Sequence, residues 1–146
     1  MPGIIVGIDG SGHSQRALEW AAKEAATHHT PLTVMTVHQA VASFFDTPEV
    51  LLEDRPETKH VGEAAQKETD EVLAKLGEAR PESVTVKAVH GFPSEVLVNA
   101  SADADLMVLG SRGQGGFARL LIGSVTFQVA QHAHCPVVIV RGRDGK

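Results

Sequence analysis

The 146-residue sequence lacks several features that mark specialised classes of protein. Its only cysteine is Cys135, which excludes a disulfide-stapled scaffold. No apolar run approaches the roughly 18 residues that cross a bilayer, and no basic region or cleavage site precedes the apolar start at Ile4. A hydrophobic content of 42% with 21% charged residues excludes a disordered chain. We therefore expect a single domain, residues 1–146, in the reducing cytoplasm.

Basic residues are scarcer than acidic ones, and the two are unevenly distributed. Subtracting 18 acids from 13 bases gives a net charge of -5, which disfavours general nucleic-acid binding. Residues 46–82 hold 11 acids and 5 bases, whereas residues 106–143 hold four arginines and no acid. The second stretch is the better place for a small anion, although a solvated surface would give the same pattern.

Glycine is absent from residues 13–61 and concentrated elsewhere. Of its 14 occurrences, four lie near the N-terminus and five in residues 110–123: Gly3, Gly7, Gly10, Gly12, Gly110, Gly113, Gly115, Gly116 and Gly123. Such clusters indicate tight turns or close approach of the backbone to a ligand.

Short apolar runs alternate with amphipathic segments along the chain. Strands are predicted at residues 3–9, 32–37, 84–89, 106–109 and 137–140. Helices are predicted at residues 14–28, 60–79 and 124–133, with a shorter one after Pro93. Ser11 or Ser14 would cap the first helix, and residues 39–58 would form a long loop that contains at most a short helical piece. This order predicts an α/β fold: a single, doubly wound, parallel five-stranded sheet with helices on both faces, Rossmann-like, in strand order 3-2-1-4-5.

Open sheets of this kind bind ligands outside the carboxyl ends of their strands, where the strand order reverses. One glycine cluster follows the first predicted strand and the other follows the fourth. If the first strand is central, those two strands are neighbours. Two features far apart in the sequence would then meet at one crevice.

The second glycine cluster has the properties of an anion-binding loop. Glycines let backbone N–H groups surround a phosphate, and Gly123-Ser124 would open a helix whose N-terminus carries partial positive charge. The Ser124 hydroxyl and Arg112 could add hydrogen bonds. Ordinary turn geometry is the alternative interpretation. Neither a P-loop motif nor a G-x-G-x-x-G after the first strand is present.

This pattern resembles the nucleotide-binding branch of the universal stress protein family. That branch carries a glycine, two residues, a second glycine, nine residues and then Gly-Ser or Gly-Thr. Here Gly110 and Gly113 are separated by two residues, and residues 114–122 precede Gly123-Ser124. The resemblance covers the whole chain. It includes residues 9–11 (Asp-Gly-Ser), 89–91 (Val-His-Gly) and 135–138 (Cys-Pro-Val-Val).

The resemblance implies a bound adenine nucleotide, ATP with Mg²⁺, and a homodimer. The residues at the nucleotide would be Gly7, Ile8 and Asp9 at the adenine and ribose, Val37 at the base through its backbone, and Leu109, Gly110, Arg112, Gly113, Gly123, Ser124, Val125 and Thr126 at the ribose and phosphates. The dimer would pair the last strands edge to edge through Val137, Val138, Ile139 and Val140, since an exposed apolar edge is otherwise a liability. Residues 39–58 match no motif of the family.

Other candidates for chemistry are weaker. Asp9 is either a turn-forming residue or a ligand contact, and not a catalytic base. His132, His134 and Cys135 have the composition of metal ligands, but residues 132 and 134 face different sides of a helix and no second half-site exists, so we expect no metal site. Cys135 would instead be a small buried residue at the strand entry.

The remaining candidates have structural explanations. No G-x-S-x-G elbow surrounds Ser111 or Ser124, which favours phosphate contact or helix capping over nucleophilic attack. Residues 28–29 (His-His) would form an exposed helix end, and Trp20 and Phe127 would lie in the core.

We therefore expect an ATP-binding regulatory homodimer of the stress response. ATP hydrolysis would be absent or slow, because no candidate base for positioning water is visible. A binder of cyclic AMP or another adenosine ligand, a small phosphoryl-transfer enzyme, and a dimerisation module with an empty crevice remain alternatives. Neither nucleic acid nor a membrane is expected as a partner.

Overall fold

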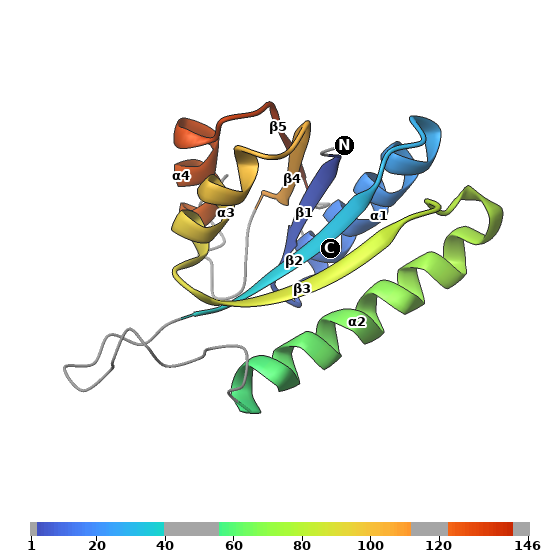
Figure 1. The fold of residues 1–146 in the computed structure, drawn as a ribbon, viewed down its shortest axis with the longest axis horizontal. Helices are drawn as coiled ribbons and strands as arrows, with labels where there is room; N and C mark the ends of the chain where they lie inside the picture. The colour runs from blue at the N-terminus through green and yellow to red at the C-terminus, as the bar shows by residue number, and fades with distance from the viewer. Residues whose placement is uncertain (1–2, 40–55, 112–122, 142–146) are drawn as a thin grey trace.

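The computed structural model describes residues 3–39, 56–111 and 123–141. Its five strands form one parallel sheet in the order β3-β2-β1-β4-β5, so the predicted fold class and strand order are confirmed. Helices α1 and α2 cover one face of the sheet and α3 and α4 the other (Figure 1). No helix in this described part is long and apolar enough to cross a membrane.

The strands and helices alternate along the chain as predicted. In chain order they are β1 (Ile4–Ile8), α1 (Gly12–Thr27), β2 (Leu32–Gln39), α2 (Pro56–Leu76), the 3₁₀ helix η2 (Gly77–Ala79), β3 (Val84–Gly91), α3 (Pro93–Ser101), β4 (Leu106–Gly110), α4 (Ser124–His132) and β5 (Val137–Val140).

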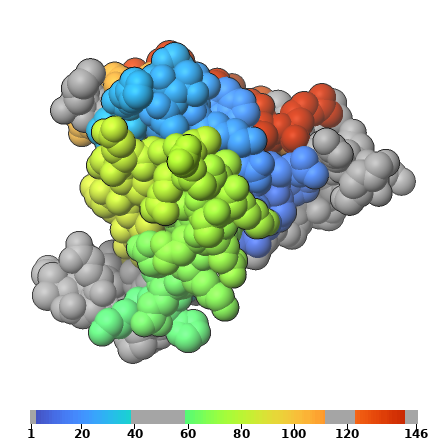
Figure 2. All heavy atoms as spheres, turned by 90° about the vertical axis from the view of Figure 1, so that its right-hand side faces the viewer, coloured from blue at the N-terminus to red at the C-terminus, as the bar shows by residue number. Residues whose placement is uncertain are grey.

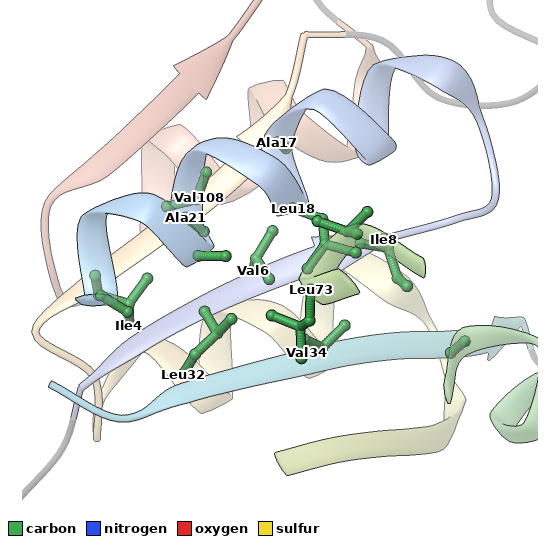
Figure 3. Close-up of a cluster of buried hydrophobic side chains, with 14 residues drawn as sticks. Ile4, Val6, Ile8, Ala17, Leu18, Ala21, Leu32, Val34, Leu73 and Val108 are labelled. Atoms are coloured by element: carbon green, nitrogen blue, oxygen red, sulfur yellow. The ribbon is translucent and has the colours of Figure 1, made fainter. Parts of the chain in front are cut away.

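The sheet separates two hydrophobic clusters because successive side chains of a strand point to opposite faces. In β2, Leu32 and Val34 belong to the cluster under α1 and α2, whereas Met35 belongs to the cluster under α3 and α4. Figure 3 shows the first cluster, where Leu18 of α1 and Leu73 of α2 meet the apolar side chains of the central strands. Both faces of β1 are thus covered, which explains its nearly unbroken apolar run.

Local signals define both ends of α1. Ser11 is the N-cap, and its hydroxyl accepts a hydrogen bond from the Ser14 N–H at 3.2 Å. At the other end His29 has a φ of 52°, and the Thr30 N–H reaches back to the Ala25 carbonyl at 3.0 Å. This is a Schellman termination with histidine in the position that glycine usually takes. His28 and His29 are exposed there, as predicted.

Several predictions about the helices were wrong in detail, beginning with the first helix, which was predicted at residues 14–28 and spans Gly12–Thr27. Helix α2 begins at Pro56, inside the predicted loop, because the fixed φ of proline suits the first turn of a helix. It ends at Leu76 and not at residue 79, because Gly77 has a φ of 58° and starts a 3₁₀ turn. Phe127 is 53% exposed and not a core residue, since Thr126 and Val129 take the inward positions of α4. Trp20 packs against the first cluster while staying partly exposed.

Candidate functional site

The carboxyl ends of β1 and β4 lie side by side, as the two glycine clusters predicted. The strands pair in parallel, and α1 starts close to the end of β4. A Cβ placed on Gly110 would lie 2.8 Å from the carbonyl oxygen of His13 and 2.9 Å from its carbonyl carbon. Only glycine permits this approach, so the first turn of α1 packs directly against the last residue of β4.

The loop after β1 is held by hydrogen bonds of three polar residues. The Ser11 N–H donates to Oδ1 of Asp9 at 3.0 Å, and the Asp9 N–H donates to the Ser14 hydroxyl at 3.2 Å. The same Ser14 hydroxyl donates to the Ser11 carbonyl at 3.0 Å. Asp9 is therefore a turn-forming residue, and its contact with a ligand stays a prediction.

The end of β4 is tied to both β5 and α4. The N–H of the buried Ser111 donates to the Val140 carbonyl at 2.9 Å, and the Ser111 carbonyl accepts from the Gly123 N–H at 2.6 Å. The hydroxyl of Thr126 donates to the Gly110 carbonyl at 2.8 Å. These bonds place the first turn of α4 directly beside the end of β4.

The N-terminus of α4 is suited to bind an anion. Its N-cap residue is Gly123, so no side chain caps the first turn. The first N–H groups of a helix have no partner within the helix, and the helix dipole adds partial positive charge there. Ser124 is exposed at this end, where its hydroxyl can add a hydrogen bond.

The side chains of several predicted ligand residues belong to the hydrophobic core. A Cβ on Gly7 would lie 2.8 Å from Cδ2 of Leu109, so this glycine makes room for packing. Ile8 and Leu109 are buried in the two clusters, and Val37 and Val125 pack against the second. Only backbone groups of such residues are suited to meet a ligand. Arg112 and Gly113 lie outside the described residues.

Sequence reasoning missed Glu68 of α2. Burial raises the pKa of its carboxyl group, and the negative charges of Asp9 and Glu71 raise it further. Its Oε2 is buried with no hydrogen-bond partner among the described residues. Nothing in the sequence distinguishes this acid from the other polar residues of α2. Its raised pKa depends on the position of α2 beside the end of β1, which the sequence does not give.

Sequence reasoning also missed a pair of histidines near the ends of β2 and β3, since it named His90 only as part of the resemblance and did not name His38. His38 and His90 are register partners, with ring centroids 5.2 Å apart. Nδ1 of His90 is buried without a hydrogen-bond partner in the described part of the chain. Their positions at the ends of two strands are visible in the sequence, but the register that pairs them is not.

Groups suited to metal binding are not assembled in the described residues. Within residues 3–39, 56–111 and 123–141, no three histidine, cysteine, aspartate or glutamate side chains gather as a metal site would require. Burial raises the pKa of the Cys135 thiol, and the charge of Asp105 adds to this effect. A raised pKa makes a thiol a poorer nucleophile and metal ligand at neutral pH.

Strand β5 lies at one edge of the sheet, where its only partner in the described sheet is β4. All four of its residues are partly exposed. This exposed edge is the surface that the predicted strand pairing would use.

Comparison with known proteins gives a consistent result. The model of the universal stress protein family matches residues 2–141. A universal stress protein of Mycolicibacterium smegmatis is 36% identical over 146 residues, covering 97% of this chain and 49% of the relative. Universal stress protein Rv2623 of Mycobacterium tuberculosis is 37% identical over 146 residues, covering 97% and 48%. The chain spans about half the length of the curated relatives that it matches.

Solved structures show the same similarity. The universal stress protein UspA from Lactobacillus plantarum has 27% sequence identity and a TM-score of 0.77, covering 96% of this chain and 97% of that one. A universal stress protein in complex with cAMP has 25% identity and a TM-score of 0.66, covering 96% of each chain.

Proposed function

Because this chain belongs to the universal stress protein family, we propose that it is an ATP-binding regulatory protein of the stress response. The nucleotide would lie across the carboxyl ends of β1 and β4. The observation that carries this proposal is the approach of Gly110 to His13, which brings the loop after β1 and the end of β4 together beside the uncapped N-terminus of α4.

The proposed binding mode uses backbone groups more than side chains. The phosphates would accept hydrogen bonds from the first N–H groups of α4 and from the Ser124 hydroxyl. The ribose and adenine would lie along Ile8, which ends β1, Asp9, which follows it, and Val37, which lies two residues before the end of the neighbouring strand β2. Bound Mg²⁺ would arrive with the phosphates, since such ions usually bind few protein ligands.

Regulation by binding agrees with the chemistry of the described residues. Slow hydrolysis of ATP does not require a general base. No sequence motif identifies one of the described residues as a nucleophile. We propose that ATP occupancy, and not turnover, is the signal, and that the protein acts in the cytoplasm. Release of many phosphates per protein per minute would contradict this assignment.

Cyclic AMP is a second candidate ligand, because one structurally similar universal stress protein was solved with it. Its single phosphate carries one negative charge, whereas ATP carries several. The helix N-terminus and the arginine-containing, acid-free stretch of residues 106–143 favour the more highly charged ligand. We therefore rank ATP first and cyclic AMP second.

We also propose a homodimer that pairs the two β5 edges through Val137–Val140. Pairing would satisfy the outward N–H and C=O groups of the edge strand and cover its partly exposed apolar residues. Two copies of this chain would together match the length of the curated relatives, about half of which it spans. Sedimentation of the purified chain tests this, and a monomer at high micromolar concentration would contradict it.

A thermal melt with ATP, ADP, AMP and cyclic AMP, with GTP as the base control, tests the binding proposal. A ligand at a hundredfold excess over its Kd adds about 2.7 kcal/mol to the free energy of unfolding, which raises the Tm by about 5–10 °C for a chain of this size. We expect ATP to give the largest shift. If no adenine nucleotide shifts the melt, the proposal is wrong.

Variants of α4 locate the phosphates. Ser124→Ala should weaken ATP binding about tenfold by removing a hydrogen bond to a charged group. Gln128→Ala is the matched control, since Gln128 is exposed on the same helix one turn further on. Gly113→Val should abolish binding while the fold stays intact. Unchanged ATP affinity in both Ser124→Ala and Gly113→Val would place the phosphates elsewhere.

A further inference from the structure

The outer side of α1 borders a hollow that shares His13 with the candidate site and Val140 with the proposed dimer edge, and whose charged residues neither proposal uses. It has a volume of about 730 Å³ and is lined from three elements: Arg16, Trp20 and Lys23 of α1, Lys75 of α2, and Val140 and Arg141 at the end of β5. Figure 2 looks onto this side of the molecule, where α1 (blue) lies between the far end of α2 (yellow-green) and β5 (red). We call this hollow the α1 groove, and we propose that it binds an acidic polypeptide segment of a partner protein.

The charge of the α1 groove carries the first part of the inference. Among the described residues that line it, Arg16, Lys23, Lys75 and Arg141 are cationic and Glu19 is the only acid. Lys23 and Glu19 are 3.5 Å apart with side chains 58% and 46% exposed, an arrangement in which an ion pair contributes little. Lys23 can therefore exchange this partner for a ligand carboxylate. The whole chain has a net charge of -5, so this cluster of cations is opposite in sign to the charge of the molecule as a whole.

The spacing of the lining residues indicates an elongated ligand. Arg16, Trp20 and Lys23 are separated by four and three residues, so they share one face of α1 and span about 10 Å along it. Lys75 and Arg141 reach the groove from other elements. One small anion would contact only part of this set, whereas a linear ligand with several carboxylates can contact cations at both ends.

Trp20 gives the groove an apolar centre between its cations. The side chain packs against the core cluster with one part and stays partly exposed with the rest. Tryptophan and arginine are among the residue types most enriched at the energetic centres of protein interfaces. The groove thus combines an aromatic anchor with flanking positive charge, and an acidic segment around one apolar residue is its complement.

A polypeptide fits these residues better than a nucleic acid. The Glu19 carboxylate can accept a hydrogen bond from a peptide N–H, a donor that a sugar–phosphate backbone lacks. The net charge of -5 opposes a long polyanion that extends beyond the groove. About six extended residues span roughly 20 Å, so a short segment is long enough to contact the whole set.

The test uses the full chain and a fluorescein-labelled acidic octapeptide, six of its residues glutamate, with leucine at its centre. Trp20 is the only tryptophan of the chain, so its emission reports directly on the groove. We expect saturable changes in peptide anisotropy and, with unlabelled peptide, in Trp20 emission. The Kd should rise with salt, because screening weakens exposed charge pairs.

Matched variants separate the groove from general charge. Arg16→Gln with Lys23→Gln should raise the Kd at least about fivefold, since two exposed charge contacts are lost. Lys59→Gln with Lys87→Gln makes the same change in net charge at exposed positions outside the groove, and should change the Kd less than twofold. All four side chains are exposed, so the thermal melts of both double variants should match the parent chain.

Three results would overturn the proposal. The first is absence of any saturable signal at millimolar peptide. The second is equal weakening by both double variants, which would indicate attraction by net charge alone. The third is tighter binding of a single-stranded oligonucleotide or of tripolyphosphate than of the peptide, which would assign the groove to phosphate-bearing ligands.

Discussion

Replacing Gly110 with alanine tests the contact on which the candidate site depends. The new Cβ would lie 2.8 Å from the His13 carbonyl oxygen, 2.9 Å from its carbonyl carbon and 3.2 Å from its Cβ. Ordinary contact between such atoms begins at about 3.5 Å, so α1 and β4 must separate by roughly 0.7 Å. The obstructing atoms belong mainly to the backbone, and the N-cap bond of Ser11 holds that turn in place.

The expected loss of stability follows from two opposing effects. Overpacking a well-packed site costs about 1–3 kcal/mol. Alanine in place of glycine lowers the conformational entropy of the unfolded chain, which raises the free energy of unfolding by about 0.4–1 kcal/mol. We therefore expect Gly110→Ala to lower the free energy of unfolding by about 1–2 kcal/mol. For a chain of this size, the Tm should fall by about 3–8 °C.

Gly12→Ala is the control for this experiment, because a Cβ on Gly12 would meet no heavy atom within 4 Å. It should leave the Tm unchanged or raise it slightly, since alanine favours a helix more than glycine does. Calorimetric melts of both variants and the parent chain at pH 7 give the answer. If Gly110→Ala is as stable as Gly12→Ala, the ends of α1 and β4 are not in contact as described.

Three further variants test local features. His29→Gly should add about 0.5–1 kcal/mol to the free energy of unfolding in urea, because glycine adopts the left-handed φ of 52° without strain; an unchanged midpoint would contradict this. Burial, and then Asp9, raise the pKa of Glu68, so its ionisation destabilises the fold as pH rises above the ordinary value of 4.5. Glu68→Gln should accordingly melt higher at pH 7 but not at pH 4, and a gap independent of pH would refute this cause. Burial and the charge of Asp105 raise the pKa of the Cys135 thiol, so iodoacetamide at pH 8 should alkylate it more slowly in the folded chain than in the chain unfolded by urea. Asp105→Asn should accelerate the reaction of the folded chain. Equal rates in the folded and unfolded chains would contradict this explanation.

The fold was predictable because each level of the sequence agrees with the others. Apolar runs of strand length alternate with segments of helical period, and that alternation leaves a parallel sheet as the solution. The start of α2 was predictable too, since Pro56 is acceptable in a first helical turn, but proline is equally common in loops and the sequence does not separate the two. The error at Phe127 has a different cause. Thr126 takes the buried position of α4 because its hydroxyl bonds to the Gly110 carbonyl, which leaves the larger apolar side chain outside.

The candidate site was predictable as an edge of the sheet but not as a set of contacts. Residues 9–12 and residues after 110 had to follow neighbouring strands, whatever the details. Whether they touch depends on where α1 begins, and the sequence offered both Ser11 and Ser14 as caps. A helix capped by Ser14 would start at Gln15, and the first turn that now meets Gly110 would not exist. The structure uses both serines instead: Ser11 caps the helix, and Ser14 accepts the Asp9 N–H, so that one short segment holds the loop and positions the helix against β4. A choice between two serines three residues apart thus decides whether the start of α1 contacts the end of β4.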